Sequence, residues 1–467
     1  MSHRGRTLFD KIWDRHLVGH RADGRELIYI DRHVLHDLHA PHAFGKLAQA
    51  GRKVRRPDLT FSMQDHSVSV QPGRNDDTYA EGAAFIRAMR KGSAENGVRV
   101  FDLGDPDQGI SHVVAPELGL VLPGATHAVP DSHACTVGGL GALAFGCGTT
   151  ELEHILATQV ITLFRPKRLR VNLLGQLGAD VAGKDVALAV IAKLGVSGGR
   201  GFAIEFAGPV ARALPIEGRL TLCNLTIEMG SRSGFIAPDA ATFKWIKGRP
   251  FAPHGAQWDQ AVAYWLTLFT DEDAVFDKEI DVDCSHLAPQ ITWGTEPSQV
   301  IGIDGRVPDP AQMDMDKRGA VERAIAYMGL EAGASIEGLP VNRVFIGSCT
   351  NSRLPDLELA ARLVKGRKVA PGVTAWAVPG SSQVKRDAEA LGLDRIFKDA
   401  GFMWGESGCS MCAGTNGDMG QAGERVLSTT NRNFENRQGR GVRTHLVGPA
   451  LAAIAAVTGR ITDVRKL

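Results

Sequence analysis

The sequence has almost no net charge and no long hydrophobic run. Its 467 residues include 53 lysines and arginines against 52 aspartates and glutamates, a formal net charge of +1 at pH 7. This balance provides no basic surface for nucleic acid or for an anionic membrane. A membrane-spanning helix needs about 20 consecutive apolar residues, and the longest apolar run, PALAAIAAV near the C-terminus, is much shorter. We therefore expect no nucleic-acid and no membrane partner.

The N-terminus lacks the features of a targeting segment. The stretch MSHRGRTLFDKIWDRH has no apolar core and carries Asp10 and Asp14, whereas a signal peptide has an apolar region and a transit peptide is poor in acidic residues. We expect a cytoplasmic protein, in which thiols stay reduced. The seven cysteines are too few over this length to form a disulfide framework, so they are available to bind metal.

Only one close cysteine pair occurs, Cys409 and Cys412 in ESGCSMCAGTNGD. Such a pair is typical of a redox site, of half a zinc site or of part of an iron–sulfur site. A redox pair opens a helix after a strand, whereas the glycines and the asparagine around this pair indicate an irregular loop. A structural zinc site needs two further ligands, usually a second close pair, and the sequence has no second pair.

Cys349 offers a third ligand. It lies in IGSCTNSR, directly after an apolar run that is expected to form a strand, where a polar turn displays its side chain. With Cys409 and Cys412 it completes a C-x59-C-x2-C pattern. Three thiolates on a four-iron cluster leave one iron without a protein ligand, and that iron can bind a substrate oxygen. From spacing alone, a zinc site and a coincidence remain open alternatives.

Short β-branched runs alternate with helical stretches, a pattern that predicts α/β architecture. A helix is expected from about 355 to 365, a strand in TAWAVPGS and a helix in SQVKRDAEALG. The length suggests about three domains of about 150 residues, with boundaries near Pro166 and Pro289. The expected domains are residues 1–165, 166–288 and 289–467.

The distinctive polar motifs fall where strands are expected to end. QDHS follows LTFSM, PDSHACT follows ATHAV, and GSCTNSR follows RVFI. In parallel α/β sheets, functional residues sit on loops beyond the carboxyl ends of the strands. One site built from several domains would explain why these motifs are spread over the whole chain.

The motifs GSCTNSR, GCSMC and STTNRNFENRQGRGVRTHLVGPA closely resemble those of the aconitase superfamily. More closely, these and FDLGDPDQGISHVVAPELGL, GRLTLCNLTIEMGSRSGFIAPD and ITWGT are similar to the large subunits of bacterial isopropylmalate isomerases (3-isopropylmalate dehydratases). The resemblance covers nearly the full length. It implies three aconitase-like α/β domains around a shared iron–sulfur cluster site. It also implies a hydro-lyase of leucine biosynthesis that isomerises 2-isopropylmalate and 3-isopropylmalate through an alkene.

The same resemblance implies a cofactor and roles for particular residues. One [4Fe–4S] cluster per subunit is held by Cys349, Cys409 and Cys412, with one iron open to substrate. His66, paired with Asp65, matches the acid that protonates the departing hydroxyl, a role that suits an imidazole held cationic by a carboxylate. The other implied catalytic residues are His112, Asp131, Ser132, His133 and Glu228. The implied substrate-binding residues are Asn224, Asn431, Arg432 and Arg437.

A partner subunit also follows from the resemblance. Aconitases carry a fourth, swivelling domain with a serine base, and this chain ends at Leu467, soon after the arginine segment. The resemblance therefore implies a separate small subunit that supplies the swivelling domain and the serine base in a heterodimer. We expect this chain alone to be inactive.

Four positions depart from the family pattern, the first being Cys135, which stands where a serine is usual. Val137 stands where a histidine is usual, Asn436 where a glycine is usual, and Val426 where a cysteine is usual. If the glycine needs a positive φ, asparagine is the next most tolerant residue. The departures leave open a paralogous hydro-lyase acting on another 2-hydroxy diacid, of the methylmalate, dimethylmalate or homoaconitate type. An RNA-binding regulator, which the near-zero charge disfavours, and a structural partner with zinc at the close cysteine pair are further alternatives.

Overall fold

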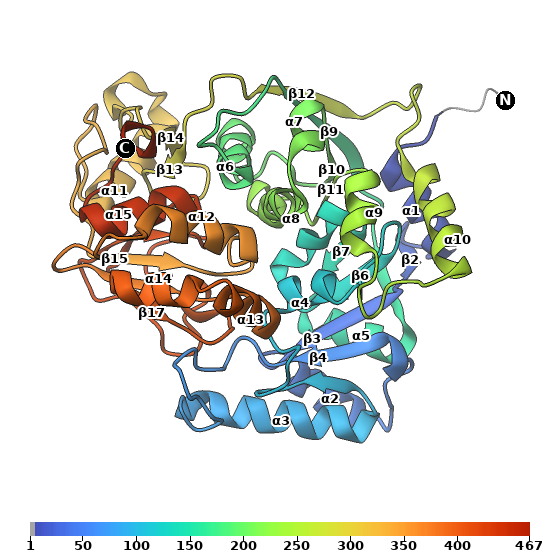
Figure 1. Ribbon diagram of the computed structural model, residues 1–467. Coiled ribbons are helices and arrows are strands. Elements are labelled where there is room, and N and C mark those ends of the chain that lie inside the picture. Colours follow the sequence, from blue (N-terminus) through green and yellow to red (C-terminus); the bar gives the residue numbers. More distant parts are fainter. Residues whose placement is uncertain (1–4) are drawn as a thin grey trace. The chain divides into compact units, whose positions relative to one another are not determined.

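The computed structural model describes residues 5–467, and the chain divides into two compact units (Figure 1). Unit 1 comprises the chain up to Ser67 together with Ala80–Gln176 and Ser197–Asp283. Unit 2 comprises Val68–Tyr79, Leu177–Val196 and Cys284–Leu467. Three parallel sheets carry the fold, two in unit 1 and one in unit 2, so the predicted α/β architecture is confirmed.

The first sheet of unit 1 has five parallel strands in the order β5-β4-β3-β6-β7. Its central strands are buried on both faces, as expected of a parallel sheet covered by helices. The strands are β3 (Arg32–His36), β4 (Thr60–Met63), β5 (Arg99–Phe101), β6 (Thr126–Val129) and β7 (Leu143–Gly146). The helices of this part are α2 (Ala40–Gln49), α3 (Ala80–Asn96), α4 (Ser111–Glu117), α5 (Thr149–Thr158) and the 3-10 segments η1 (Pro57–Leu59) and η2 (Ser132–Leu140).

The second sheet of unit 1 has four parallel strands in the order β11-β10-β9-β12. One hydrophobic core joins it to the first sheet, since Phe145 of β7 and Phe235 of β11 belong to the same buried cluster. Its strands are β9 (Lys167–Leu174), β10 (Phe202–Ala207), β11 (Ser233–Phe235) and β12 (Lys278–Asp283). The helices are α1 (Leu8–His16), α7 (Pro209–Ala213), α8 (Ile216–Asn224), η3 (Leu225–Met229), α9 (Ala240–Ile246), α10 (Ala256–Trp265) and η4 (Leu266–Leu268). A small antiparallel sheet is made of β1 (Leu17–His20), β2 (Glu26–Tyr29) and β8 (Val160–Leu163).

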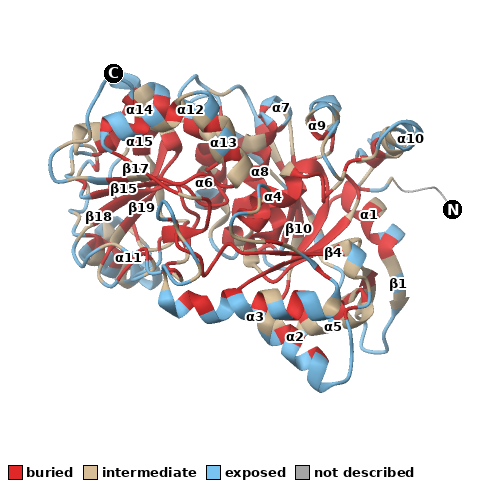
Figure 2. Cartoon of the chain, turned by 60° about the horizontal axis from the view of Figure 1, so that its bottom comes forward, coloured by how far each residue is buried: buried red, intermediate tan, exposed pale blue. Residues whose placement is uncertain are grey.

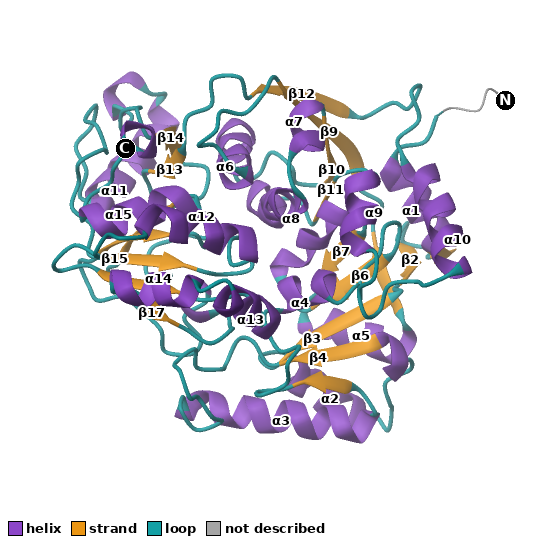
Figure 3. Cartoon of the chain, in the orientation of Figure 1, coloured by secondary structure: helices purple, strands orange, loops and turns teal. Residues whose placement is uncertain are grey.

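The sheet of unit 2 has five parallel strands in the order β17-β16-β15-β18-β19, seen as orange arrows in Figure 3. Figure 2 shows its central strands in the red of buried residues, and every residue of β15 and β18 is buried. The strands are β15 (Arg343–Ile346), β16 (Thr374–Ala377), β17 (Met403–Trp404), β18 (Arg425–Ser428) and β19 (Arg443–Leu446), with a separate antiparallel pair β13 (Gln290–Thr292) and β14 (Val300–Gly302). The helices are α6 (Gly183–Leu194), η5 (Pro310–Gln312), α11 (Met315–Met328), α12 (Leu354–Val364), α13 (Ser382–Ala390), α14 (Leu393–Ala400), η6 (Ser410–Cys412), α15 (Pro449–Thr458) and η7 (Val464–Lys466).

The elements expected in the last third of the sequence are present. α12 and α13 are the two expected helices, and β16 is the expected strand. α13 begins at Ser382 because the Ser381 hydroxyl accepts the N–H of Val384 as an N-cap. Each parallel sheet falls within one of the three expected segments, but α6 lies in the middle segment and belongs to unit 2. The domain boundaries stay a prediction. Within residues 5–467, no helix is both long and apolar enough to cross a membrane.

Candidate active site

In unit 1, three loops meet at the carboxyl edge of the first sheet. β3, β4 and β6 are neighbours in that sheet and run parallel, so their carboxyl ends lie side by side. β3 ends at His36, β4 is followed by Asp65 and His66, and β6 is followed by Asp131. The motifs that the sequence placed at strand ends in this unit are therefore brought together.

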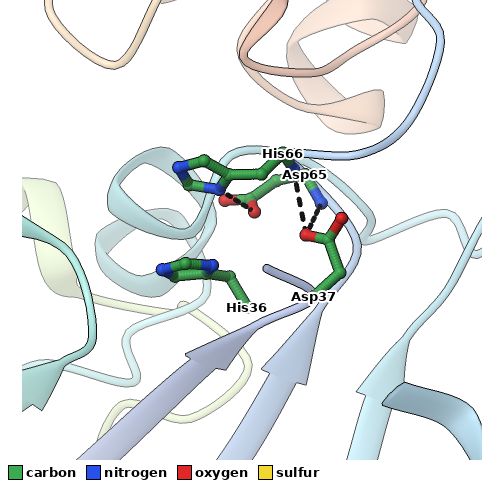
Figure 4. Close-up of side chains that lie close together, drawn as sticks. All are labelled: His36, Asp37, Asp65 and His66. Atoms are coloured by element: carbon green, nitrogen blue, oxygen red, sulfur yellow. Dashed lines mark hydrogen bonds and ion pairs between the residues drawn. The ribbon is translucent and has the colours of Figure 1, made fainter. Parts of the chain in front are cut away.

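Asp37 shapes the loop that carries Asp65 and His66 (Figure 4). It is fully buried, and its Oδ1 accepts the backbone N–H groups of Asp65 at 3.1 Å and of His66 at 3.0 Å, while its Oδ2 accepts that of Ser67 at 2.6 Å. Burial and the nearby Asp65 carboxylate raise the pKa of Asp37, and the imidazole and backbone groups counter this. Sequence reasoning missed Asp37, because its role is visible only in contacts with residues about 30 positions away.

His66 lies between two carboxylates. Its Nδ1 donates to Asp65 Oδ1 at 2.6 Å, and its Nε2 is 3.3 Å from Asp131 Oδ2. Burial raises the pKa of Asp65, but the adjacent His66 imidazole and the N–H of Ser111 outweigh burial and lower it to about 2. Asp65 is therefore ionised at neutral pH, the condition for holding a proton on the His66 imidazole.

His36 lies directly beneath His66 (Figure 4). The two rings stack with centroids 4.2 Å apart and an interplanar angle of 23°. His36 Nε2 donates to the Pro130 carbonyl at 2.8 Å, and burial lowers the pKa of His36 to about 3. Because His36 stays neutral, its ring adds no positive charge beside the His66 ring on which it stacks.

Asp131 connects the histidines of this group. Its Oδ1 accepts from His112 Nε2 of α4 at 2.8 Å and from the backbone N–H of His133 at 2.7 Å. Burial opposes ionisation of Asp131, but the imidazoles of His112, His133 and His66 hold its pKa well below the usual range. One carboxylate thus lies within 3.5 Å of three imidazoles.

The network continues to Glu228 in η3. His133 Nε2 donates to Glu228 Oε1 at 2.9 Å, and the Ser132 Oγ lies 3.3 Å from His133 Nδ1. Asn224, at the end of α8, is fully buried, and its amide donates to Thr136 Oγ1 at 2.8 Å. All the residues of unit 1 that the resemblance singled out are therefore linked, directly or through one neighbour.

Two of the departures from the family pattern lie in hydrophobic cores. Val137 is fully buried in the apolar cluster under the first sheet, and Val426 belongs to the apolar cluster of unit 2. Val137 lies in η2, whose backbone approaches β11 so closely that a Cβ at Gly138 would be 1.8 Å from the Gly234 carbonyl oxygen. Val137 therefore contributes packing, and its side chain does not belong to the network of carboxylates and imidazoles.

In unit 2, two of the three predicted thiol ligands converge on the same polar side chains. The Ser348 hydroxyl lies 3.2 Å from Cys412 Sγ and 3.9 Å from Cys349 Sγ. The Asn431 amide nitrogen lies 3.5 Å from Cys349 Sγ, and its oxygen accepts from the Cys412 thiol at 3.3 Å. Cys409 directly precedes the turn η6, which ends at Cys412. All three thiols are buried and none forms a disulfide.

The cysteine loop is irregular, as its glycines predicted, and it is anchored from within. Met411, between the two cysteines, is fully buried in the apolar cluster of unit 2. Ser410 has a φ of 49°, and its hydroxyl donates to Asp418 Oδ2 at 2.8 Å. This anchoring excludes a thioredoxin-like helix opening and presents the two thiols from a fixed turn.

The three thiols fit an iron–sulfur cluster better than a single metal ion. Ligand sulfurs on one zinc each lie about 2.3 Å from the metal and thus close together. Among the described residues, the group of ligand atoms that all lie within 4.8 Å of one another is that of His36, Asp37, Asp65 and His66, not the thiols. In that group the carboxylates are already used by backbone N–H groups and by His66. Thiolates are the ligands that iron–sulfur clusters take.

The two predicted substrate arginines follow Asn431. Arg432 and Arg437 are both half-buried, and Arg437 Nε donates to the Cys412 carbonyl at 3.1 Å, which holds that guanidinium beside the cysteine loop. Asn436, between them, has a φ of 64°, so the conformation anticipated for the replaced glycine is confirmed. Its side-chain oxygen accepts the N–H of Gly441 at 2.9 Å, a bond that glycine lacks.

One residue near the thiols was not expected from the sequence. Lys184 of α6 is fully buried and donates from Nζ to the Thr429 carbonyl at 3.0 Å and to the Thr430 carbonyl. Burial lowers its pKa to about 8, while the thiol groups of Cys412 and Cys349 act in the opposite direction. Lys184 could have been singled out from the sequence, because it falls in the first turn of a helix, where the helix dipole disfavours a cation.

Comparison with known proteins gives three findings. The model of the aconitase family (aconitate hydratase) matches residues 10–459. The chain is 53% identical over 465 residues to a protein of Bradyrhizobium diazoefficiens named 3-isopropylmalate dehydratase large subunit 1, an alignment that covers 99% of this chain and 97% of that protein. The crystal structure of holo-form aconitase X from Thermococcus kodakaraensis superposes with a TM-score of 0.47 at 13% identity, covering 87% of this chain and 84% of that one.

Proposed function

Because this chain belongs to the aconitase family, we propose that it is the large subunit of a 3-isopropylmalate dehydratase. In this function it is a hydro-lyase that interconverts 2-isopropylmalate and 3-isopropylmalate by dehydration and rehydration through an alkene, a step of leucine biosynthesis. The observation that carries the proposal is the 53% identity over 99% of the chain to a protein bearing that name. The intact network of carboxylates and imidazoles in unit 1 supplies the acid–base groups that such a reaction needs.

We assign the protonation of the departing hydroxyl to His66. The ionised Asp65 accepts from Nδ1, so the proton on Nε2 is the one that can be transferred. Asp131, 3.3 Å from Nε2, stabilises the cationic ring before transfer. Asp37 keeps His66 in place through three backbone N–H bonds. A positioned acid of this kind accelerates a reaction by about 10² to 10⁴-fold.

Cys349, Cys409 and Cys412 would hold a [4Fe–4S] cluster with one iron open to substrate. When bound, the cluster supplies a Lewis acid that weakens the carbon–oxygen bond of the substrate hydroxyl. Arg432 and Arg437 bind the substrate carboxylates, because a guanidinium presents two parallel N–H groups to one carboxylate. The resemblance also gives Asn224 and Asn431 a substrate-binding role, and Asn431 lies beside the sulfurs of Cys349 and Cys412.

We further propose a small subunit as partner, which contributes the swivelling domain and the serine base. The support is the words "large subunit" in the name of the relative. Expression of this chain alone is expected to give no turnover, and co-expression with the small subunit is expected to restore it. Full turnover by the isolated chain would contradict this assignment.

An anaerobic ultraviolet assay of alkene formation with the co-expressed subunits tests which substrate the enzyme prefers. We expect isopropylmalate to be preferred over methylmalate, dimethylmalate and substrates of the homoaconitate type. Val137 lies in a core and Asn436 keeps the backbone conformation of the usual glycine, so neither departure favours a different substrate. Preference for a shorter or longer diacid would refute the leucine assignment while leaving the hydro-lyase chemistry in place.

A further inference from the structure

Lys184 occupies a position that is unfavourable for a positively charged side chain. It is fully buried, and it lies in the first turn of α6, where the partial positive charge of the helix end opposes a cation. Burying an ammonium group is costly unless it is paired or hydrogen-bonded. Among residues 5–467, no other lysine is buried. Something near Lys184 must therefore offset the cost of its burial.

The direct partners of Lys184 are two consecutive backbone carbonyls, not a carboxylate. Its Nζ donates to the Thr429 oxygen at 3.0 Å and to the Thr430 oxygen. The neighbouring Asp185 is engaged elsewhere, because it accepts the N–H groups of Ala182 at 2.9 Å and of Gln290 at 2.7 Å. The countercharge of Lys184 is thus not supplied by a hydrogen-bonded acid.

The two carbonyls belong to the segment after β18 that leads to Asn431, a residue in contact with the thiols. Thr429 follows β18, and its Oγ1 is bonded to both the N–H and the carbonyl of Gly347 at 2.9 Å. Thr350, next to Cys349, also donates to the Thr429 carbonyl. Asn431 directly follows Thr430; its amide nitrogen lies 3.5 Å from Cys349 Sγ, and its amide oxygen lies 3.3 Å from Cys412 Sγ. Lys184 therefore fastens the segment from which Asn431 reaches both sulfurs.

Lys184 interacts electrostatically with the thiol groups. The thiol groups of Cys412 and Cys349 favour its charged form, as do the carboxyl groups of Asp185 and Asp356, in opposition to the lowering of its pKa by burial. Three thiolates around a cluster leave a net negative charge in a buried place, and in a medium of low dielectric a nearby cation stabilises that charge strongly.

We propose that Lys184 is a positioning residue for the iron–sulfur cluster. It holds the Thr429 and Thr430 carbonyls, which keeps the Asn431 amide nitrogen beside Cys349 Sγ, and its positive charge offsets the negative charge of the thiolates. The inference rests on the proposed cluster. It differs from a purely structural role for the lysine, because it assigns an electrostatic effect on the cluster itself.

The test uses the co-purified large and small subunits after anaerobic reconstitution with iron and sulfide. Lys184→Met removes the charge and keeps the length, Lys184→Arg restores a charge, and Lys193→Met, an exposed position on the same helix, is the matched control. Iron and sulfide per chain, the rate of iron loss to a chelator and the reduction potential of the cluster are measured. Partners behind the direct ligands typically contribute about 10 to 100-fold in metal affinity.

We expect Lys184→Met to lose iron at least about tenfold faster than the wild type and to shift the reduction potential to a more negative value, since a nearby cation favours the reduced cluster. Lys184→Arg should return the potential toward that of the wild type, and Lys193→Met should match the wild type. If Lys184→Met does not fold, Lys184→Gln, which keeps a donor for one carbonyl but no charge, decides by the same potential.

An unchanged potential and rate of iron loss in the charge-free variants would overturn the inference, even if their melting temperature fell. That result would leave Lys184 as a structural residue of unit 2. Failure of the wild type to take up iron and sulfide would be a different outcome, since it would overturn the proposed cluster and this inference together.

Discussion

Replacement of Asp65 by asparagine tests the assignment of His66 as the acid. In the wild type, Asp65 Oδ1 lies 2.6 Å from His66 Nδ1. Asparagine keeps the size of the side chain and an oxygen that can accept this hydrogen bond, but it removes the negative charge. The fall of the Asp65 pKa from 3.8 to about 2 corresponds to about 2 kcal/mol of stabilisation of the ionised pair. We expect kcat to fall by about 10² to 10⁴-fold, the usual contribution of a general acid, and the free energy of unfolding to fall by about 2 kcal/mol at pH 7.

The pH dependence of this loss has a definite sign. The pKa of Asp65 is about 2 in the folded protein and 3.8 for an unperturbed group, so its stabilisation is complete above about pH 4 and is lost as the pH falls toward 2. In urea titrations, the stability difference between the wild type and Asp65→Asn should therefore shrink on acidification below pH 4.

Asp58→Asn is the matched control, because Asp58 is exposed and its ion pair with Arg56 at the surface contributes only about 0 to 1 kcal/mol. A kcat for Asp65→Asn within about threefold of the wild type would refute the role of the pair as the general acid.

Three further changes test other parts of the site. Cys349→Ser should remove most of the iron bound after reconstitution, because a serine hydroxyl is a poor ligand for iron, whereas Cys147→Ser should retain it; equal iron contents by metal analysis would contradict the ligand assignment. Arg437→Lys should raise KM about tenfold or more with unchanged iron content, because lysine cannot form the two parallel bonds to a carboxylate; an unchanged KM would exclude Arg437 from substrate binding. Asn436→Ala should lower the free energy of unfolding by about 1 to 2 kcal/mol, because its φ of 64° is unfavourable for alanine; Asn436→Gly should lose less, and the opposite order in thermal melts would show that the backbone conformation is not the cause.

Much of the site could be predicted because its residues lie in short sequence motifs. Cys349, Cys409 and Cys412 stand out through their spacing and their glycine-rich surroundings, and the resemblance of their motifs to the aconitase family is confirmed over residues 10–459. The alternation of short buried strands with amphipathic helices likewise predicted α/β architecture, because periodicity is a local property of the chain.

The partners of these residues could not be predicted in the same way. Asp37 acts through backbone groups 28 to 30 positions further along the chain, and a lone aspartate after a strand carries no signal of that contact. The stacking of the His36 ring on His66 is likewise a contact that no local motif indicates. Val137 was suspected of changing the pocket, and its burial in the apolar cluster shows that it contributes packing instead.

The sequence by itself determined the fold class and the family, and it predicted the thiol ligands and the residue types of the acid–base group, because each depends on short motifs or on local periodicity. The tertiary structure alone decided which groups share a proton or a charge. Lys184 meets Thr429 across 245 positions, and His133 meets Glu228 across 95. Hydrogen bonds and electrostatic effects act over a few ångströms in space, and only the order of the strands in each sheet brings such distant positions within that range.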